Sequence, residues 1–122
     1  MTSPADTQAY LRLRLADRRF EVFGAIYLDS KHRVIAFEEL FHGTIDGASV
    51  CPRVVVQRAL EHNAAALIAY HCHPSGDPTP SRADEVLTHR LKDALALLDI
   101  RLLDHFVVSA EGSVSMAERG LL

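Results

Sequence analysis

Two histidines, one residue apart, stand before a short loop that leads to a serine and an aspartate. The histidines are His71 and His73, and Ser81 and Asp84 follow the loop. Side chains alternate across a β-strand, so histidines at this spacing can point to one side and reach one ion. Two neutral imidazoles and one carboxylate form a catalytic zinc set that leaves a fourth position open for water. The spacing therefore predicts a Zn²⁺ site held by His71, His73 and Asp84, with the Ser81 hydroxyl beside it.

The loop between the histidines and the aspartate contains residues that restrict its shape. Gly76 permits a tight turn, and the prolines lower the entropy lost when the loop takes one conformation; they are Pro74, Pro78 and Pro80. Ser81 and Asp84 also have the spacing of a helix capping box, which is the commoner use of that pattern. Capping and metal binding are compatible, because a carboxylate in the first turn of a helix is favoured by the helix dipole as well.

The rest of the chain supplies helices and strands to position these groups. Helices are predicted over residues 3–16, from Pro52 to about Leu60, and from Ser81 to about Leu98, although the alternation in residues 11–15 also fits a strand. Strands are predicted over residues 20–28, 33–41, 64–70, 99–109 and 114–116, and residues 43–49 read as a loop. The order α-β-β-α-β-α-β-β predicts an α/β fold in which a mixed sheet is flanked by helices.

Length and composition narrow the class of protein. The 122 residues suit one domain, 1–122, and a hydrophobic content of 48% allows a buried core. The net charge of −3 argues against binding to nucleic acid by bulk positive charge, and only the stretch from Arg12 to Arg19 is locally basic. Two cysteines form no disulfide framework, and no apolar run reaches the length of a membrane span or signal sequence. A cytoplasmic protein is expected.

The chemistry-bearing residues also resemble a known motif. The pattern His71-x-His73, then ten residues, then Asp84, with Ser81 three residues before it, resembles the JAMM motif of MPN-domain metalloproteases. The string from His73 to Ser81 (HPSGDPTPS) and the stretches 37–44 and 101–105 resemble the RadC branch of that superfamily. The resemblance covers nearly the whole chain.

The resemblance implies an MPN/JAB fold, which is cytidine-deaminase-like, and a zinc ion on His71, His73 and Asp84. The implied reaction is hydrolysis of an amide or isopeptide bond in a peptide or protein by zinc-activated water. The family's general base is a glutamate on an early strand, and Glu21 best fits that place; Glu38 and Glu39 are the alternatives. Ser81 is the candidate donor to the oxyanion.

Two departures from the RadC pattern qualify these expectations. Cys72 stands between the histidines, where RadC proteins usually have asparagine; strand alternation turns it away from the ion, so a buried thiol is expected. The N-terminal helix-hairpin-helix segment of full-length RadC proteins is absent from this sequence. A DNA repair or replication accessory protein, with zinc structural or vestigial, is therefore the second hypothesis, and an interaction scaffold is the third. Homo-oligomers are compatible with all three.

Overall fold

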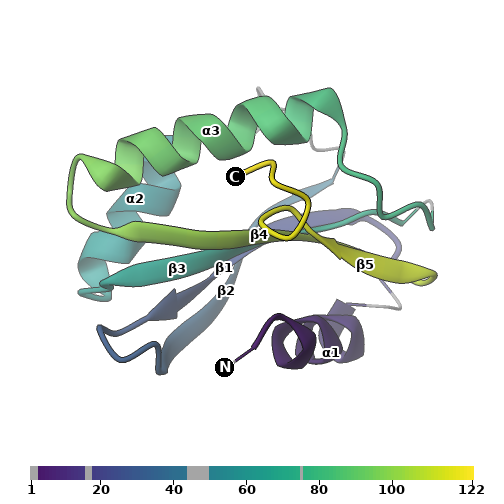
Figure 1. Cartoon of the computed structure of the whole chain (residues 1–122), viewed down its shortest axis with the longest axis horizontal. Coiled ribbons are helices and arrows are strands. Elements are labelled where there is room, and N and C mark those ends of the chain that lie inside the picture. Colours follow the sequence, from purple (N-terminus) through teal and green to yellow (C-terminus); the bar gives the residue numbers. More distant parts are fainter. Residues whose placement is uncertain (1–2, 16–17, 44–49, 75) are drawn as a thin grey trace.

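The computed structural model describes residues 3–15, 18–43, 50–74 and 76–122. Three helices and five strands follow one another in the predicted order, α-β-β-α-β-α-β-β, which confirms the expected fold class (Figure 1). The helices are α1 (Pro4–Leu15), α2 (Pro52–Glu61) and α3 (Arg82–Ala96). The strands are β1 (Glu21–Leu28), β2 (Val34–Gly43), β3 (Ala66–Cys72), β4 (Arg101–Ser109) and β5 (Gly112–Ser115).

The five strands form one mixed sheet in the order β2-β1-β3-β4-β5. Strands β3 and β4 are parallel, because α3 returns the chain to the edge of the sheet at which β3 begins. The other neighbouring pairs are antiparallel. Helix α1 covers one face of the sheet, and α2 and α3 cover the other (Figure 1). The sheet is therefore the middle layer of three.

Strand β3 lies at the centre of these layers. All seven of its residues are buried, since both faces of the strand are covered by helices. Alternation divides its side chains between the two cores: Leu67 and Ala69 pack towards α2 and α3, whereas Ile68 and Tyr70 pack towards α1. By the same alternation, His71 lies on the α3 side, where the loop to α3 begins.

The elements differ from their predicted bounds mostly at their ends. Strand β3 starts two residues later than predicted and runs on through Cys72, because β1 and β4 pair with it along this whole length. Strand β5 starts at Gly112, two residues early, because Gly112 pairs with Ser109 across a tight turn. Helix α1 forms where the alternating pattern also allowed a strand. The predicted loop over 43–49 lies outside the described residues except for Gly43, which ends β2.

Helix lengths bear on the membrane question raised by the sequence. The longest helix, α3, has 15 residues, whereas a helix that crosses a bilayer needs about 20 apolar ones. Within the described ranges, none of the helices has the length and hydropathy of a transmembrane segment.

Gly24 on β1 is expected to tolerate no side chain. A Cβ atom there would lie 2.1 Å from the Glu38 carbonyl oxygen and 2.2 Å from the Tyr70 hydroxyl oxygen. The Tyr70 hydroxyl donates to that same carbonyl at 2.7 Å, so neither group can move away without breaking the bond. Gly24→Ala should therefore lower the free energy of unfolding by about 2–4 kcal/mol, through overpacking and loss of the hydrogen bond. Chemical denaturation measures the effect. Gly112→Ala is the matched control, since the nearest atom to a Cβ there is 3.9 Å away, and an equal loss in both variants would contradict the explanation.

Candidate metal centre

His71 and His73 lie together where β3 ends. His71 is the last but one residue of β3, and the His73 backbone N–H donates to the Val108 carbonyl of β4 at 2.8 Å. This bond holds His73 beside the strand end. The two imidazole rings have centroids 4.6 Å apart and are nearly perpendicular, and His71 is only 2% exposed. The predicted pairing of the two side chains on one face is therefore present.

Asp84 reaches the histidines from the first turn of α3. Its Oδ1 lies 3.1 Å from His71 Nδ1, and its Oδ2 lies 3.5 Å from His73 Nε2. The same Oδ2 accepts a 2.7 Å hydrogen bond from the Ser81 backbone N–H, while the Ser81 hydroxyl oxygen accepts from the Asp84 backbone N–H at 3.1 Å. The predicted capping box is thus formed, and it fixes the carboxylate against both imidazoles.

The contacts around Asp84 shift the proton affinities of the centre. Burial alone would raise the pKa of the Asp84 carboxyl, but hydrogen bonds from His71, His73 and the Ser81 backbone outweigh it and hold that pKa far below its usual range. The Asp84 carboxylate raises the pKa of His73, against a smaller opposing effect of burial, and the Asp77 carbonyl adds to the rise. Asp84 therefore stays ionised, and the metal-free centre favours a proton on His73.

Glu21 brings a second carboxylate to the same place. It is the first residue of β1, next to Val22, which pairs with Cys72, so the strand register sets Glu21 beside the end of β3. Glu21 Oε1 lies 3.8 Å from His71 Nε2. One potential ligand atom from each of Glu21, His71 and His73 lies within 4.8 Å of the other two.

The two alternative glutamates on β2 lie in other ion pairs. Glu38 pairs with Arg58, at 2.5 Å, and with His62, at 3.1 Å, on the α2 side of the sheet. Glu39 pairs with Arg18 at 2.6 Å and with His42 at 2.9 Å. Of the three glutamates that the sequence left open as the base, only Glu21 lies against the histidines.

The donor set suits a zinc ion. His71 Nε2 is buried and has no hydrogen-bond partner among the described residues, as expected for an atom kept for an ion. His73 Nδ1 can donate to the Asp77 carbonyl at 3.1 Å, which leaves its Nε2 lone pair facing the centre. Ligands on one tetrahedral zinc lie about 3.3 Å apart, because each bond is about 2.0 Å long. The 3.5 Å between Asp84 Oδ2 and His73 Nε2 is close to that value, whereas the 3.1 Å between Asp84 Oδ1 and His71 involves Nδ1 and not the unpartnered Nε2.

The two carboxylates face different nitrogens of His71. Asp84 contacts Nδ1, and Glu21 lies on the side of Nε2. One ion can bind only one of these nitrogens, so it is shared with either Asp84 or Glu21 while the other carboxylate remains for proton transfer or orientation. The variants Glu21→Gln and Asp84→Asn separate these two assignments.

Comparison with known proteins identifies the fold around this centre. The family model described as a RadC-like JAB domain matches residues 1–121. The chain belongs to the RadC-like JAB domain family. Curated relatives include the UPF0758 proteins of Thioalkalivibrio sulfidiphilus, 66% identical over 122 residues, and of Halorhodospira halophila and Nitrosococcus oceani, each 62% identical over 122 residues. Each of these matches covers all of this chain and 54% of the relative, so the JAB domain spans about half the length of the curated relatives it matches.

Cys72 of the JAB domain points away from the centre, as alternation predicts. It is 2% exposed and packs among side chains on the α1 side of the sheet. Its Sγ lies 3.5 Å from the Leu15 carbonyl oxygen at the end of α1. The expected buried thiol is confirmed, and the asparagine usual in the RadC pattern is replaced at a position that faces the opposite core.

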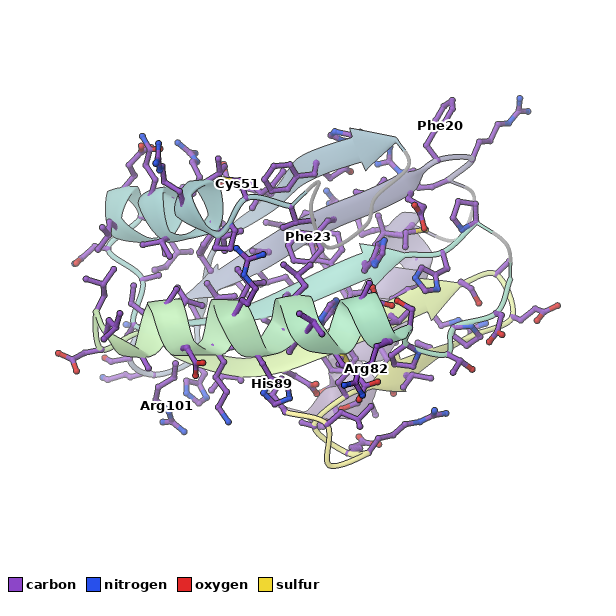
Figure 2. All side chains as sticks on the ribbon, turned by 90° about the horizontal axis from the view of Figure 1, so that it is seen from above. Phe20, Phe23, Cys51, Arg82, His89 and Arg101 are labelled. Carbon is purple, nitrogen blue, oxygen red and sulfur yellow. The ribbon has the colours of Figure 1, made fainter. Side chains whose placement is uncertain are left out.

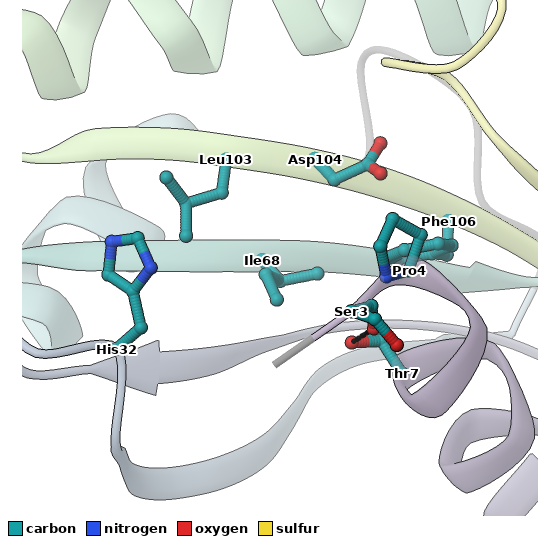
Figure 3. A pocket seen from close by; sticks show the side chains of 8 residues that line it. All are labelled: Ser3, Pro4, Thr7, His32, Ile68, Leu103, Asp104 and Phe106. Atoms are coloured by element: carbon teal, nitrogen blue, oxygen red, sulfur yellow. Dashed lines mark hydrogen bonds between the residues drawn. The ribbon is translucent and has the colours of Figure 1, made fainter. Parts of the chain in front are cut away.

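The neighbouring pair Asp104–His105 does not form a catalytic dyad. Asp104 lines a small pocket of about 150 Å³ beside the start of α1 (Figure 3). Its carboxylate accepts from the Ser115 hydroxyl and from two backbone N–H groups. His105 packs on the opposite face, with its ring edge against Phe23 at a centroid distance of 5.6 Å. Adjacent residues of one strand point to opposite faces, so the two groups serve different cores.

Thr88 and His105 form a buried contact next to the Asp84 backbone that the sequence analysis did not predict. The Thr88 hydroxyl donates to the Asp84 carbonyl at 2.6 Å, and it lies 2.6 Å from His105 Nδ1. Burial lowers the pKa of His105 to about 3, so the ring is neutral. A threonine four residues after Asp84 in the same helix was the available signal, because threonine often bonds to the carbonyl one turn before it. These contacts tie the first turn of α3 to β4.

Ser81→Ala tests the capping contribution. The variant removes the side-chain acceptor for the Asp84 backbone N–H, and should lower the free energy of unfolding by about 1 kcal/mol. Ser81→Asn or Ser81→Asp, which can also cap, should restore most of that stability in urea denaturation. Unchanged stability in Ser81→Ala would contradict the capping role.

Proposed function

We propose that the JAB domain is a zinc-dependent hydrolase that cleaves an amide or isopeptide bond of a peptide or protein. The observation that carries the proposal is the meeting of two histidines with two carboxylates from separate elements at the end of β3: Asp84 at 3.1 Å from His71 and Glu21 at 3.8 Å. A structural zinc site uses every position for protein ligands. Because Asp84 and Glu21 lie beside different nitrogens of His71, one ion can be shared with only one of them. The other carboxylate is then available to transfer a proton, as a hydrolase requires.

The proposed ligands are His71, His73 and Asp84. Zinc, when bound, polarises a carbonyl group and lowers the pKa of water to about 7. The Asp77 carbonyl holds the His73 tautomer through Nδ1, and the capping box holds the Asp84 carboxylate in place. These contacts orient the ligands before the ion arrives, and such outer contacts sustain metal affinity.

Glu21 is the proposed general base. Its side chain is 26% exposed, so it can meet both solvent and substrate, unlike His71 at 3%. In the proposed reaction Glu21 accepts a proton from the attacking water and delivers it to the nitrogen of the leaving amine. The Ser81 hydroxyl accepts a bond from the Asp84 backbone, and its own proton is proposed to stabilise the developing oxyanion.

The nucleic-acid alternative draws less support from the described residues. Arg14 lies 4.5 Å from the centroid of the Phe37 ring, and Arg18 pairs with Glu39 at 2.6 Å. Two of the basic residues between Arg12 and Arg19 are thus engaged within the fold. The accessory-protein hypothesis predicts salt-dependent binding to DNA that weakens when these arginines are neutralised.

Metal analysis followed by a cleavage assay tests the proposal. Elemental analysis should find about one zinc per chain in the wild type and little in His73→Ala, because a site that loses one of three protein ligands holds zinc weakly. His89→Ala, which changes an exposed histidine on α3, should retain the zinc. The zinc-loaded protein is then incubated with peptide libraries, including peptides joined through a lysine side chain, and new amines are detected by mass spectrometry. A zinc-loaded wild type that cleaves none of them would favour the accessory or scaffold role.

A further inference from the structure

The outer side of α2 and the end of α3 enclose an apolar groove that is separate from the metal centre. Its volume is about 620 Å³. Leu97 is 85% exposed and Leu60 is 56% exposed, and both line this groove. Figure 2 shows α2 and α3 side by side, with the start of α3 at Arg82. Exposed leucines gathered at one groove are a feature of surfaces that bind another protein.

The charges along the groove are arranged symmetrically on α2. Arg53 and Glu61 both line the groove, and each lies four residues from Gln57, near the opposite ends of the helix. If two α2 helices pack antiparallel about a two-fold axis at Gln57, each Arg53 faces the Glu61 of the other copy. The two Gln57 amides then face each other, and an amide can both donate and accept. A two-fold interface requires this kind of self-complementary surface.

Contacts within the chain leave these end charges accessible. Arg53 is exposed and has no ion-pair partner in the described part of the chain. Glu61 contacts Arg58 through its Oε2 oxygen and is still 46% exposed. Leu60 lies on the same helix one residue from Glu61, so the apolar and charged contacts occur on one continuous surface.

We propose that a second copy of this chain binds this groove and forms a two-fold dimer through α2 and the end of α3. The exposed leucines at 60 and 97 of each copy pack against the other copy, and the two Arg53–Glu61 pairs set the antiparallel register. Asp84 and Leu97 lie near opposite ends of α3, about 20 Å apart at 1.5 Å per residue. The dimer therefore leaves both metal centres open, and it neither requires nor excludes the proposed hydrolase activity.

Sedimentation equilibrium of the 122-residue chain, at concentrations from low micromolar to near millimolar, tests the proposal. The wild type should form a dimer. Arg53→Glu and Glu61→Arg should each weaken dimerisation at least about tenfold, because each places like charges opposite one another. The double variant Arg53→Glu/Glu61→Arg should recover dimerisation, since it restores both pairs with their signs exchanged. A monomeric wild type at every concentration, or a double variant as weak as the single ones, would overturn the proposal.

A matched pair of leucine variants locates the interface. Leu97→Asp should weaken the dimer, whereas Leu13→Asp, at a leucine of equal 85% exposure on α1, should not. Circular dichroism and zinc content should match the wild type in both variants, which separates a lost interface from a lost fold. A dimer that survives Leu97→Asp, or that Leu13→Asp weakens equally, places the contact elsewhere and rejects the groove.

Discussion

Glu21→Gln is expected to lower the rate of hydrolysis by about 100- to 10,000-fold, the usual contribution of a positioned general base, while zinc stays bound. Glutamine has nearly the same shape as glutamate but cannot take up a proton at neutral pH. Since His71, His73 and Asp84 are unchanged, the proposed ligand set is intact. The measurements are kcat on a cleaved peptide and zinc content by elemental analysis, both compared with the wild type.

Asp84→Asn is the matched partner of this experiment. The asparagine oxygen can still accept from the Ser81 backbone N–H, so the helix cap is largely kept while the ligand charge is lost. If Asp84 is the ligand, zinc affinity should fall by at least about 100-fold, because even outer-contact variants of metal sites lose 10- to 100-fold. If Glu21→Gln loses zinc and Asp84→Asn keeps it, then Glu21 is the ligand and Asp84 is the candidate base. That outcome is physically distinct because the carboxylates face opposite nitrogens of His71.

The part of the centre that lies close together in the chain could be predicted from the sequence. Strand alternation sets His71 and His73 on one face, and the capping-box spacing fixes Asp84 relative to Ser81. Both rules are local, because they depend on backbone geometry within a few residues. The element order and the direction of Cys72, away from the two histidines, follow from the same rules.

The part that depends on strand pairing could be narrowed but not decided. Glu21, Glu38 and Glu39 all stand on early strands, and only the register of β1 against β3 shows which of them meets the histidines. The ion pair of Glu38 with Arg58 joins residues 20 positions apart, and no local sequence pattern predicts it. Thr88 and His105 likewise meet across 17 positions, through the packing of α3 on β4. Long-range packing, rather than propensity, decided these contacts.

Zinc is expected to stabilise the JAB domain against unfolding, more strongly at about pH 8 than at about pH 5.5. A ligand that binds only the folded state at a thousandfold excess over its Kd adds about 4 kcal/mol to the free energy of unfolding. The proton competes with the ion for His73, and the Asp84 carboxylate raises the pKa of that histidine above its ordinary 6.5. Lowering the pH through the raised pKa therefore weakens zinc binding earlier than for an unperturbed histidine.

The contribution of His73 to the stability of the metal-free protein should show the opposite trend with pH, whereas buried His105, whose pKa is lowered to about 3, favours the higher pH. The stability contributed by His73, whose pKa is raised on folding, is fully present below 6.5 and is lost as the pH rises through the raised value. The contribution of Asp84, whose pKa is lowered, is present above 3.8 and is lost only as the pH falls below it. At about pH 5.5 both contributions are in place, and once the pH has risen through the raised pKa of His73 an ionised Asp84 faces an uncharged imidazole.

Urea denaturation with a chelator, and again with zinc in excess, measures both trends at the two pH values. In His73→Ala, zinc should add less to the free energy of unfolding than in the wild type. The metal-free variant should also lose less of that free energy between about pH 5.5 and 8. His89→Ala, on the exposed face of α3, should behave as the wild type. Equal zinc stabilisation of His73→Ala and the wild type would place the ion elsewhere. A metal-free protein more stable at about pH 8 than at 5.5, in the wild type but not in His73→Ala, would contradict the raised pKa of His73 itself. The two failures are separate, because the first concerns the ion and the second concerns the contact between His73 and Asp84.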